Sequence, residues 1–168
     1  SDADNVICSG QSITFTGSGS SSYQFSVNGV PQGSYSATPT FTTSGLTNGQ
    51  SVTVSGSTLG CISVSSPITT TVNAIPATLL TNNDGNNVFC SDQLVTFTAS
   101  GATNYEFFVN GVSQGISSPT NTLTSSGMGI GANTVTVVGN SNNCTSSATN
   151  NVTINPLPTA GITSSDND

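Results

Sequence analysis

The 168-residue sequence contains no lysine, no arginine and no histidine, and seven carboxylates give it a formal net charge of −7. Proteins that bind nucleic acids use cationic side chains to displace counterions from phosphates, so the sequence excludes a nucleic-acid partner. Binding to anionic membranes or to phosphorylated ligands is disfavoured for the same reason. Enzymes that rely on a histidine base, a lysine nucleophile or an arginine clamp are also excluded.

Long apolar runs, tryptophan and a charged-then-apolar leader are also missing from the sequence. No stretch of about 18 apolar residues is present, so we expect no membrane insertion. Disorder is not expected despite the low charge, because valine, isoleucine and threonine are abundant and phenylalanine and tyrosine recur in phase.

What the sequence does contain is one pattern of about eighty residues that occurs twice. The pattern recurs after 82 positions in its first half, after 83 following one inserted residue, and after 82 again at its end. The matched pairs are Cys8/Cys90, Phe15/Phe97, Tyr23/Tyr105, Phe25/Phe107, Val52/Val135, Cys61/Cys144 and Pro76/Pro158. Tandem repetition with this period is typical of arrays that do mechanical or spacing work.

The repeats give the expected domain boundaries. Proline cannot donate to a strand ladder, so Pro76 and Pro158 suit the ends of modules. We expect a first β-sandwich repeat over residues 1–76 that lacks its opening strand, and a second over 77–158. Residues 159–168 are expected to be the opening strand of a third repeat, since the sequence ends where a third copy would begin.

Strand signals dominate each copy. Tyr23, Phe25 and Val27 alternate with polar residues and lead directly into an Asn-Gly pair, and the second copy repeats this from Tyr105 onward. Asn-Gly between two alternating runs is a strong signal for a hairpin with a type I′ turn. About seven short strands per copy predict an all-β fold of two tandem immunoglobulin-like β-sandwiches. In place of the missing tryptophan, the paired tyrosines and phenylalanines are expected to fill the core.

The four cysteines occur two per copy. The simplest pairing is Cys8–Cys61 and Cys90–Cys144, one disulfide in each sandwich, with four free buried thiols as the alternative. A loop of this length closed by a disulfide would stabilise the fold by about 4 kcal/mol in the chain-entropy model. No Cys-x₂-Cys spacing is present, so a metal site built on these residues is not expected. Disulfides indicate an extracellular location.

These residues carry a resemblance. The sequence resembles the immunoglobulin/PKD-like repeats of giant Bacteroidetes cell-surface adhesins. The resemblance lies in the run from Val6 to Thr16 around Cys8, in the Tyr-x-Phe-x-Val-Asn-Gly segment after it, and in the Gly-Cys pair at Cys61. Within that group, the sequence resembles the repeats of the SprB-type gliding-motility adhesin. The resemblance implies an exported repeat protein at the cell surface and, more remotely, a role in gliding motility.

A short acidic motif occurs three times with the same period. Its members, which are possible calcium ligands, are Asp2, Asp4, Asp84, Asn86, Asp166 and Asp168. Alternate oxygen ligands on a loop suit Ca²⁺ with weak extracellular affinity, about 10⁻⁴–10⁻³ M. The alternative is that these residues only form Asx-turns. Calcium is the only cofactor expected, and it would stiffen the junctions between repeats.

Two functions remain open. The first is a spacer or stalk in an extracellular adhesin whose partners are neighbouring repeats of the same chain. The second is a module that binds a polysaccharide or a solid surface through exposed aromatic residues, with Tyr35, Phe89 and Phe108 as candidates. No catalytic residue is expected, because Glu106 is matched by Gln24 in the other copy and a carboxylate pair is therefore lacking. The spacer is favoured because core positions are kept between copies and surface positions vary.

Overall fold

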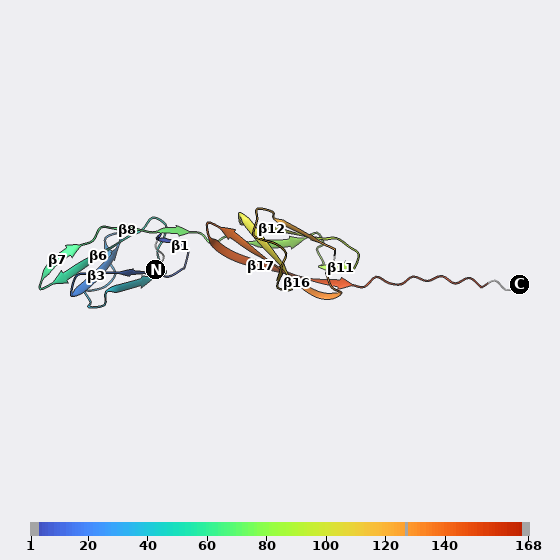
Figure 1. Ribbon diagram of the computed structural model, residues 1–168, viewed down its shortest axis with the longest axis horizontal. Helices are drawn as coiled ribbons and strands as arrows, with labels where there is room; N and C mark the ends of the chain where they lie inside the picture. The colour runs from blue at the N-terminus through green and yellow to red at the C-terminus, as the bar shows by residue number, and fades with distance from the viewer. Residues whose placement is uncertain (1–3, 127, 166–168) are drawn as a thin grey trace. The chain divides into compact units, whose positions relative to one another are not determined.

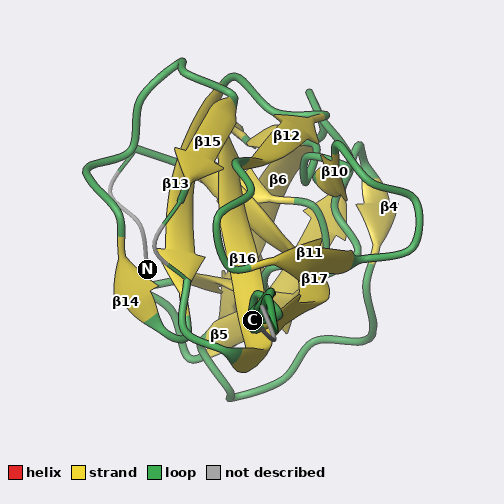
Figure 2. Ribbon diagram, turned by 90° about the vertical axis from the view of Figure 1, so that its right-hand side faces the viewer, coloured by secondary structure: helices red, strands yellow, loops and turns green. Residues whose placement is uncertain are grey.

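The computed structural model of the chain describes residues 4–126 and 128–165. Every regular element in these residues is a β-strand, as the strand and loop colours of Figure 2 show. None of them belongs to a helix that is long and apolar enough to cross a membrane. The chain divides into two units, one of Ser1–Ile75 with Asn142–Cys144, the other of Pro76–Ser141 with Thr145–Asp168. In Figure 1 the first unit runs from blue to green, and the second continues to red.

The described residues of the first unit form nine strands in three sheets. They are β1 (Val6–Cys8), β2 (Ile13–Thr16), β3 (Ser22–Val27), β4 (Val30–Pro31), β5 (Thr40–Thr43), β6 (Ser51–Thr58), β7 (Cys61–Val64), β8 (Ile68–Thr69) and β9 (Thr71–Asn73). The largest sheet has the order β4-β3-β6-β7, with β8 also paired to β6. β2 pairs antiparallel with β5, and β1 pairs parallel with β9.

Alternation places the core of the first unit. In β3 the side chains of Tyr23 and Phe25 are buried, while Gln24 between them is half-buried. They pack in one cluster with Phe15 from β2, Val52 from β6 and Phe41. The hydroxyl of Tyr23 does not lack a hydrogen-bond partner, because it donates to the Ser20 carbonyl (2.6 Å). The expectation that aromatic residues of β3 fill the core is confirmed.

In the second unit, the part that the structure describes forms eight strands in two sheets. They are β10 (Leu79–Asn82), β11 (Val88–Cys90), β12 (Val95–Ser100), β13 (Asn104–Val109), β14 (Val112–Ser113), β15 (Thr122–Ser125), β16 (Gly131–Ser141) and β17 (Cys144–Asn155). One sheet has the order β10-β12-β15 and the other the order β11-β17-β16-β13-β14. Phe97 of the first sheet and Val135 and Val137 of the second share one cluster and are fully buried. The unit is therefore a two-layered β-sandwich.

The Asn-Gly pairs that follow Val27 and Val109 form the expected hairpin turns. Asn28 and Gly29 have φ of 48° and 78°, and Asn110 and Gly111 have φ of 50° and 80°. Positive φ at both central residues is the requirement of a type I′ turn, which connects β3 to β4 and β13 to β14.

β10, the first strand of the second unit, lies at one edge of the sheet that contains β12. β12 therefore pairs with β10 on one side and with β15 on the other, whereas β2, its counterpart in the first unit, pairs only with β5 among the described residues. Residues 159–165 form no strand. Their role as the opening strand of a further repeat stays a prediction, and residues 166–168 lie outside the described part of the chain.

Candidate functional site

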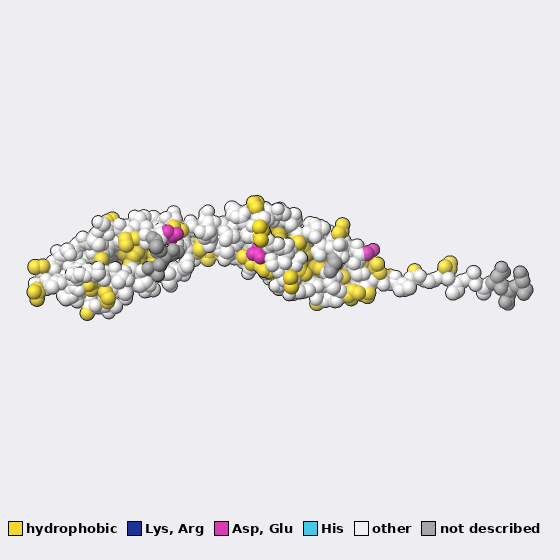
Figure 3. All heavy atoms as spheres, viewed as in Figure 1, with side chains coloured by type: hydrophobic (Ala, Val, Ile, Leu, Met, Phe, Trp, Pro, Cys, Tyr) yellow, Lys and Arg dark blue, Asp and Glu magenta, His cyan; other side chains and the backbone are white. Residues whose placement is uncertain are grey.

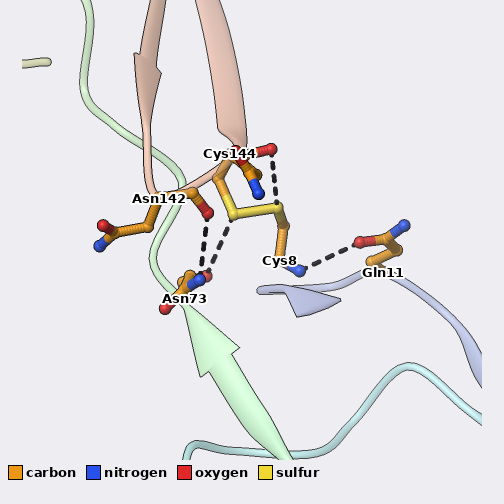
Figure 4. The surroundings of a disulfide bond; sticks show 6 residues. Cys8, Gln11, Asn73, Asn142 and Cys144 are labelled. Atoms are coloured by element: carbon orange, nitrogen blue, oxygen red, sulfur yellow. Dashed lines mark hydrogen bonds between the residues drawn. A yellow bond between two sulfur atoms is a disulfide. The ribbon is translucent and has the colours of Figure 1, made fainter. Parts of the chain in front are cut away.

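The most distinctive chemical feature is a disulfide between Cys8, the last residue of β1, and Cys144, the first residue of β17. The two Cα atoms lie 5.6 Å apart, within the usual range for a disulfide. The bond closes a sequence separation of 136 residues. Figure 4 shows the bridge with the side chains around it.

Backbone and amide groups hold both ends of this bridge. The Cys8 N–H donates to Oε1 of Gln11 (3.0 Å), and the Ser9 N–H donates to the Asn73 carbonyl (2.8 Å). On the other side, Nδ2 of Asn73 donates to the carbonyl of Asn142 (3.1 Å) in the turn that precedes Cys144. We call Cys8, Gln11 and Asn73 the strand-end frame, and residues 141–144 the hairpin turn.

The predicted disulfides Cys8–Cys61 and Cys90–Cys144 are wrong. Cys90 lies opposite Asn155 at the end of β17, whereas Cys144 begins the same strand. At about 3.3 Å per residue, the eleven residue steps from Cys144 to Asn155 span about 36 Å, far beyond the 7 Å that a disulfide allows between Cα atoms.

The first unit has the same arrangement. Cys8 pairs with Asn73 of β9, whereas Cys61 follows the turn at the far end of β6. In Figure 1, β1 and β7 are labelled at opposite ends of the unit. Among the described residues, Cys61 and Cys90 carry free, exposed thiols. The prediction failed because strand spacing in the sequence does not tell which end of a strand each cysteine occupies.

Two of the three acidic motifs contain described residues, and both form Asx-turns. Oδ1 of Asp4 accepts from the Val6 N–H (2.9 Å), and Oδ1 of Asp84 accepts from the Asn86 N–H (3.2 Å). Oδ1 of Asn86 in turn accepts from the Val88 N–H (2.7 Å). Within residues 4–126 and 128–165, no group of three acidic, cysteine or histidine side chains could hold a metal. Asp2, Asp166 and Asp168 lie outside the described residues, and calcium binding stays a prediction.

The aromatic candidates for a binding surface are placed unequally. Phe89 is only 3% exposed and belongs to the core of the second unit, so its assignment to a binding surface is wrong. The signal that would have found it is Ile7, the apolar residue at the same place in the first copy, which is also buried. Tyr35 is exposed and Phe108 is half-buried.

Sequence reasoning missed a shallow groove that occurs at the same place in each unit. In the second unit it has a volume of about 290 Å³, and in the first about 180 Å³. Most residues that line it are the same in both copies, among them Gln32/Gln114, Gly33/Gly115, Ser36/Ser118, Thr38/Thr120 and Thr40/Thr122. Backbone hydrogen bonds account for part of this retention, since Ser36 and Tyr23 bond each other's backbone, as do Ser118 and Tyr105.

No protein-family model and no curated protein matches the chain. Among solved structures, the fibronectin(III)-like modules of CbhA from Clostridium thermocellum match it with a TM-score of 0.50 and 14% identity, over 95% of this chain and 94% of that one. The amphioxus IgVJ-C2 molecule matches with a TM-score of 0.39 and 13% identity, over 88% of this chain and 99% of that one.

These likenesses concern the fold. The chain is an all-β protein with immunoglobulin-like and fibronectin-III-like neighbours. No solved structure among them points to a gliding adhesin.

Proposed function

We propose that the chain is a structural repeat module of an extracellular cell-surface adhesin, a spacer or stalk built from tandem β-sandwiches. The observation that carries the proposal is the position of the Cys8–Cys144 disulfide, which closes a loop of 136 residues. A tension applied to the two chain ends passes through this covalent bond. The residues between the two cysteines therefore experience no pull along the backbone, and most strands of both units lie between them.

The size of this effect follows from chain geometry. An extended chain reaches at most about 3.3–3.6 Å per residue. The disulfide therefore prevents the closed loop from adding about 450 Å to the length of the stretched chain. A protein that keeps its length under tension suits a stalk that holds another part of an adhesin away from the cell. Low charge and small polar side chains fit the same role, since the sequence has no lysine or arginine at which a trypsin-like protease could cut.

Location and partners belong to the same proposal. A disulfide persists in oxidising compartments, which supports an extracellular, cell-surface location. The partners are neighbouring repeats of the same chain. A part in surface adhesion or gliding motility rests on the sequence resemblance alone.

Single-molecule stretching tests the spacer. The chain is pulled from its two ends, with Cys61 and Cys90 replaced by serine so that only the Cys8–Cys144 bond remains. We expect the reduced protein to extend by about 450 Å more than the oxidised protein, because reduction releases the closed loop. The Cys144→Ser variant is the control and should extend like the reduced protein under both conditions. Equal extension of the oxidised and reduced proteins would contradict the spacer.

Calcium at the acidic motifs is a separate part of the proposal. Asp4 and Asp84 each use one carboxylate oxygen in an Asx-turn, which leaves the other oxygen for a cation. With few carboxylates per motif, only weak binding is expected, at about millimolar metal. We expect millimolar CaCl₂ to raise the Tm, and Asp84→Asn to reduce that rise. An unchanged Tm with calcium would leave the motifs as turns only.

Carbohydrate binding remains the second candidate, because most residues of the groove lining are the same in both units. The test is a glycan array probed with the whole chain and with a Thr38→Val, Thr120→Val variant. These changes remove two hydroxyls from the grooves and keep the side-chain shape. Binding by the chain that the variant loses would favour a ligand-binding module, whereas an array without signal favours the spacer.

A further inference from the structure

We propose that Cys61 and Cys90 form a second disulfide of the Cys8–Cys144 type, between two copies of this chain. Cys90 of one copy would bond Cys61 of the next, so that copies join head to tail. The inference names the partner of two thiols that the spacer proposal does not use. It deepens that proposal but would hold equally for a carbohydrate-binding module, because it rests only on how the cysteines are held.

The first argument is that the strand-end frame occurs twice. The Cys90 N–H donates to Oε1 of Gln93 (2.6 Å), as the Cys8 N–H does to Gln11 (3.0 Å). Cys90 pairs with Asn155 in a parallel ladder, as Cys8 pairs with Asn73. The Ser91 N–H donates to the Asn155 carbonyl at 2.9 Å, close to the 2.8 Å of the equivalent bond. Cys90 is therefore presented as Cys8 is, with an asparagine beside it.

The hairpin turn also occurs twice. Asn142 and Asn143, which precede Cys144, have φ of 51° and 64°. Leu59 and Gly60, which precede Cys61, have φ of 52° and 83°, so both turns have the same left-handed backbone. Leucine rarely adopts this left-handed conformation, which makes its presence at the tip of the turn informative. Cys61 therefore occupies the same position in its turn as Cys144 occupies in the turn that carries the disulfide.

Exposure distinguishes the bonded from the free half-sites. Cys144 is 1% exposed, whereas Cys61 and Cys90 are both exposed. The turn with Cys61 also presents Leu59, 99% exposed, together with Ile62 and Val64, which are 62% and 63% exposed. Apolar side chains lie at this end of the first unit in Figure 3.

The strand-end frame of Cys90 has exposed apolar neighbours too. Val88, on the same face of β11 as Cys90, is 42% exposed, and Leu94, next to Gln93, is 62% exposed. Isolated exposed apolar residues are ordinary, but here they flank both unpaired thiols and would be covered by the proposed contact. The first strand-end frame has serine at the place of Leu94, since Gln11 is followed by Ser12.

The bond forms by two thiol–disulfide exchanges with a small-molecule disulfide, such as oxidised glutathione. The Cys90 thiolate attacks the glutathione disulfide, which gives a mixed disulfide and releases one glutathione thiol. The Cys61 thiolate of the second copy then attacks the Cys90 sulfur and releases the second glutathione thiol. Two cysteine thiols lose two electrons and two protons, and one glutathione disulfide is reduced to two thiols.

The test mixes two single variants of the whole chain in equal amounts, Cys61→Ser with a mass label and Cys90→Ser without one, under a glutathione buffer. Intact mass spectrometry without reductant then counts the dimers. Random coupling of exposed thiols gives about half heterodimer. We expect about tenfold more heterodimer than either homodimer, because only Cys90 with Cys61 completes the contact. Homodimers in random proportion, or no dimers, would overturn the inference.

A further variant separates guided from accidental coupling. Gln93→Leu in the chain that supplies Cys90 removes the hydrogen bond to the Cys90 N–H and leaves the thiol in place. We expect the heterodimer excess to fall toward the random proportion. In the wild-type chain, an internal Cys61–Cys90 bond would also overturn the inference. The stretching experiment above uses protein without these two cysteines, so the spacer and the linkage can fail independently.

Discussion

At the scale of single residues, Thr70 carries a buried hydroxyl that has no hydrogen-bond partner within the described part of the chain. Its side chain is 0% exposed, and its own backbone is bonded to Gln50 and Gly49. Val152 stands at the same place in the second copy and is 2% exposed. A buried hydroxyl without a partner costs about 1–3 kcal/mol, so the first unit carries a destabilising group that the second unit lacks.

We therefore expect Thr70→Val to raise the free energy of unfolding of the first unit by about 1 kcal/mol, since valine has nearly the same shape and no hydroxyl to satisfy. Urea denaturation followed by tyrosine fluorescence measures the change. Thr69→Val is the matched control, because the neighbouring Thr69 is exposed and the change should stay within about 0.5 kcal/mol. A loss of stability for Thr70→Val would mean that the hydroxyl is hydrogen-bonded in solution.

At the scale of elements, the segment that leads into β10 crosses closely over a glycine. A Cβ placed on Gly101 would overlap the carbonyl oxygen of Ala77, whereas a Cβ on Gly19, at the same place in the first copy, would meet nothing within 4 Å. Both glycines have positive φ, 88° for Gly101 and 82° for Gly19. The two positions therefore differ in packing and share the backbone requirement.

This difference predicts unequal effects of one substitution. Gly19→Ala should cost about 1 kcal/mol through its left-handed backbone alone. Gly101→Ala should cost about 2–4 kcal/mol, because overpacking against the Ala77 carbonyl is added. Chemical denaturation of both variants measures the difference. Equal losses would show that the segment before β10 is not held against Gly101.

The elements also show what the sequence could predict. The hairpins after β3 and β13 followed from alternation and from an Asn-Gly pair, both of which are local signals. The cysteine pairing required knowledge of which ends of strands face each other, and no local pattern carries that information. The burial of Phe89 could have been predicted only by comparing the two copies. The residues next to Phe89 gave no sign of burial, but the apolar Ile7 at the same position in the other copy did. The grooves were missed because their lining comes from separate segments of each copy.

At the scale of the whole molecule, the covalent connections matter more than charge or pockets. Each copy places one cysteine in a strand-end frame and the other in a hairpin turn, and the Cys8–Cys144 bond joins one of each kind. In the chain-entropy model, closing 136 residues stabilises the folded state by up to about 5 kcal/mol. We expect the Cys144→Ser variant to unfold at a lower Tm than the oxidised wild-type chain.

The connection itself can be mapped by proteolysis without reductant. Trypsin has no site in the sequence, but cleavage after phenylalanine and tyrosine separates the four cysteines into the fragments 1–15, 42–89, 90–97 and 109–168. Native protein is first alkylated, which should modify Cys61 and Cys90 because both are exposed. Mass spectrometry should then find fragment 1–15 linked to fragment 109–168. In the Cys144→Ser control, Cys8 should become alkylated as well. Links of 1–15 to 42–89 and of 90–97 to 109–168 would instead show one disulfide within each copy. That result would contradict both the Cys8–Cys144 disulfide, on which the spacer proposal rests, and the head-to-tail linkage through Cys61 and Cys90.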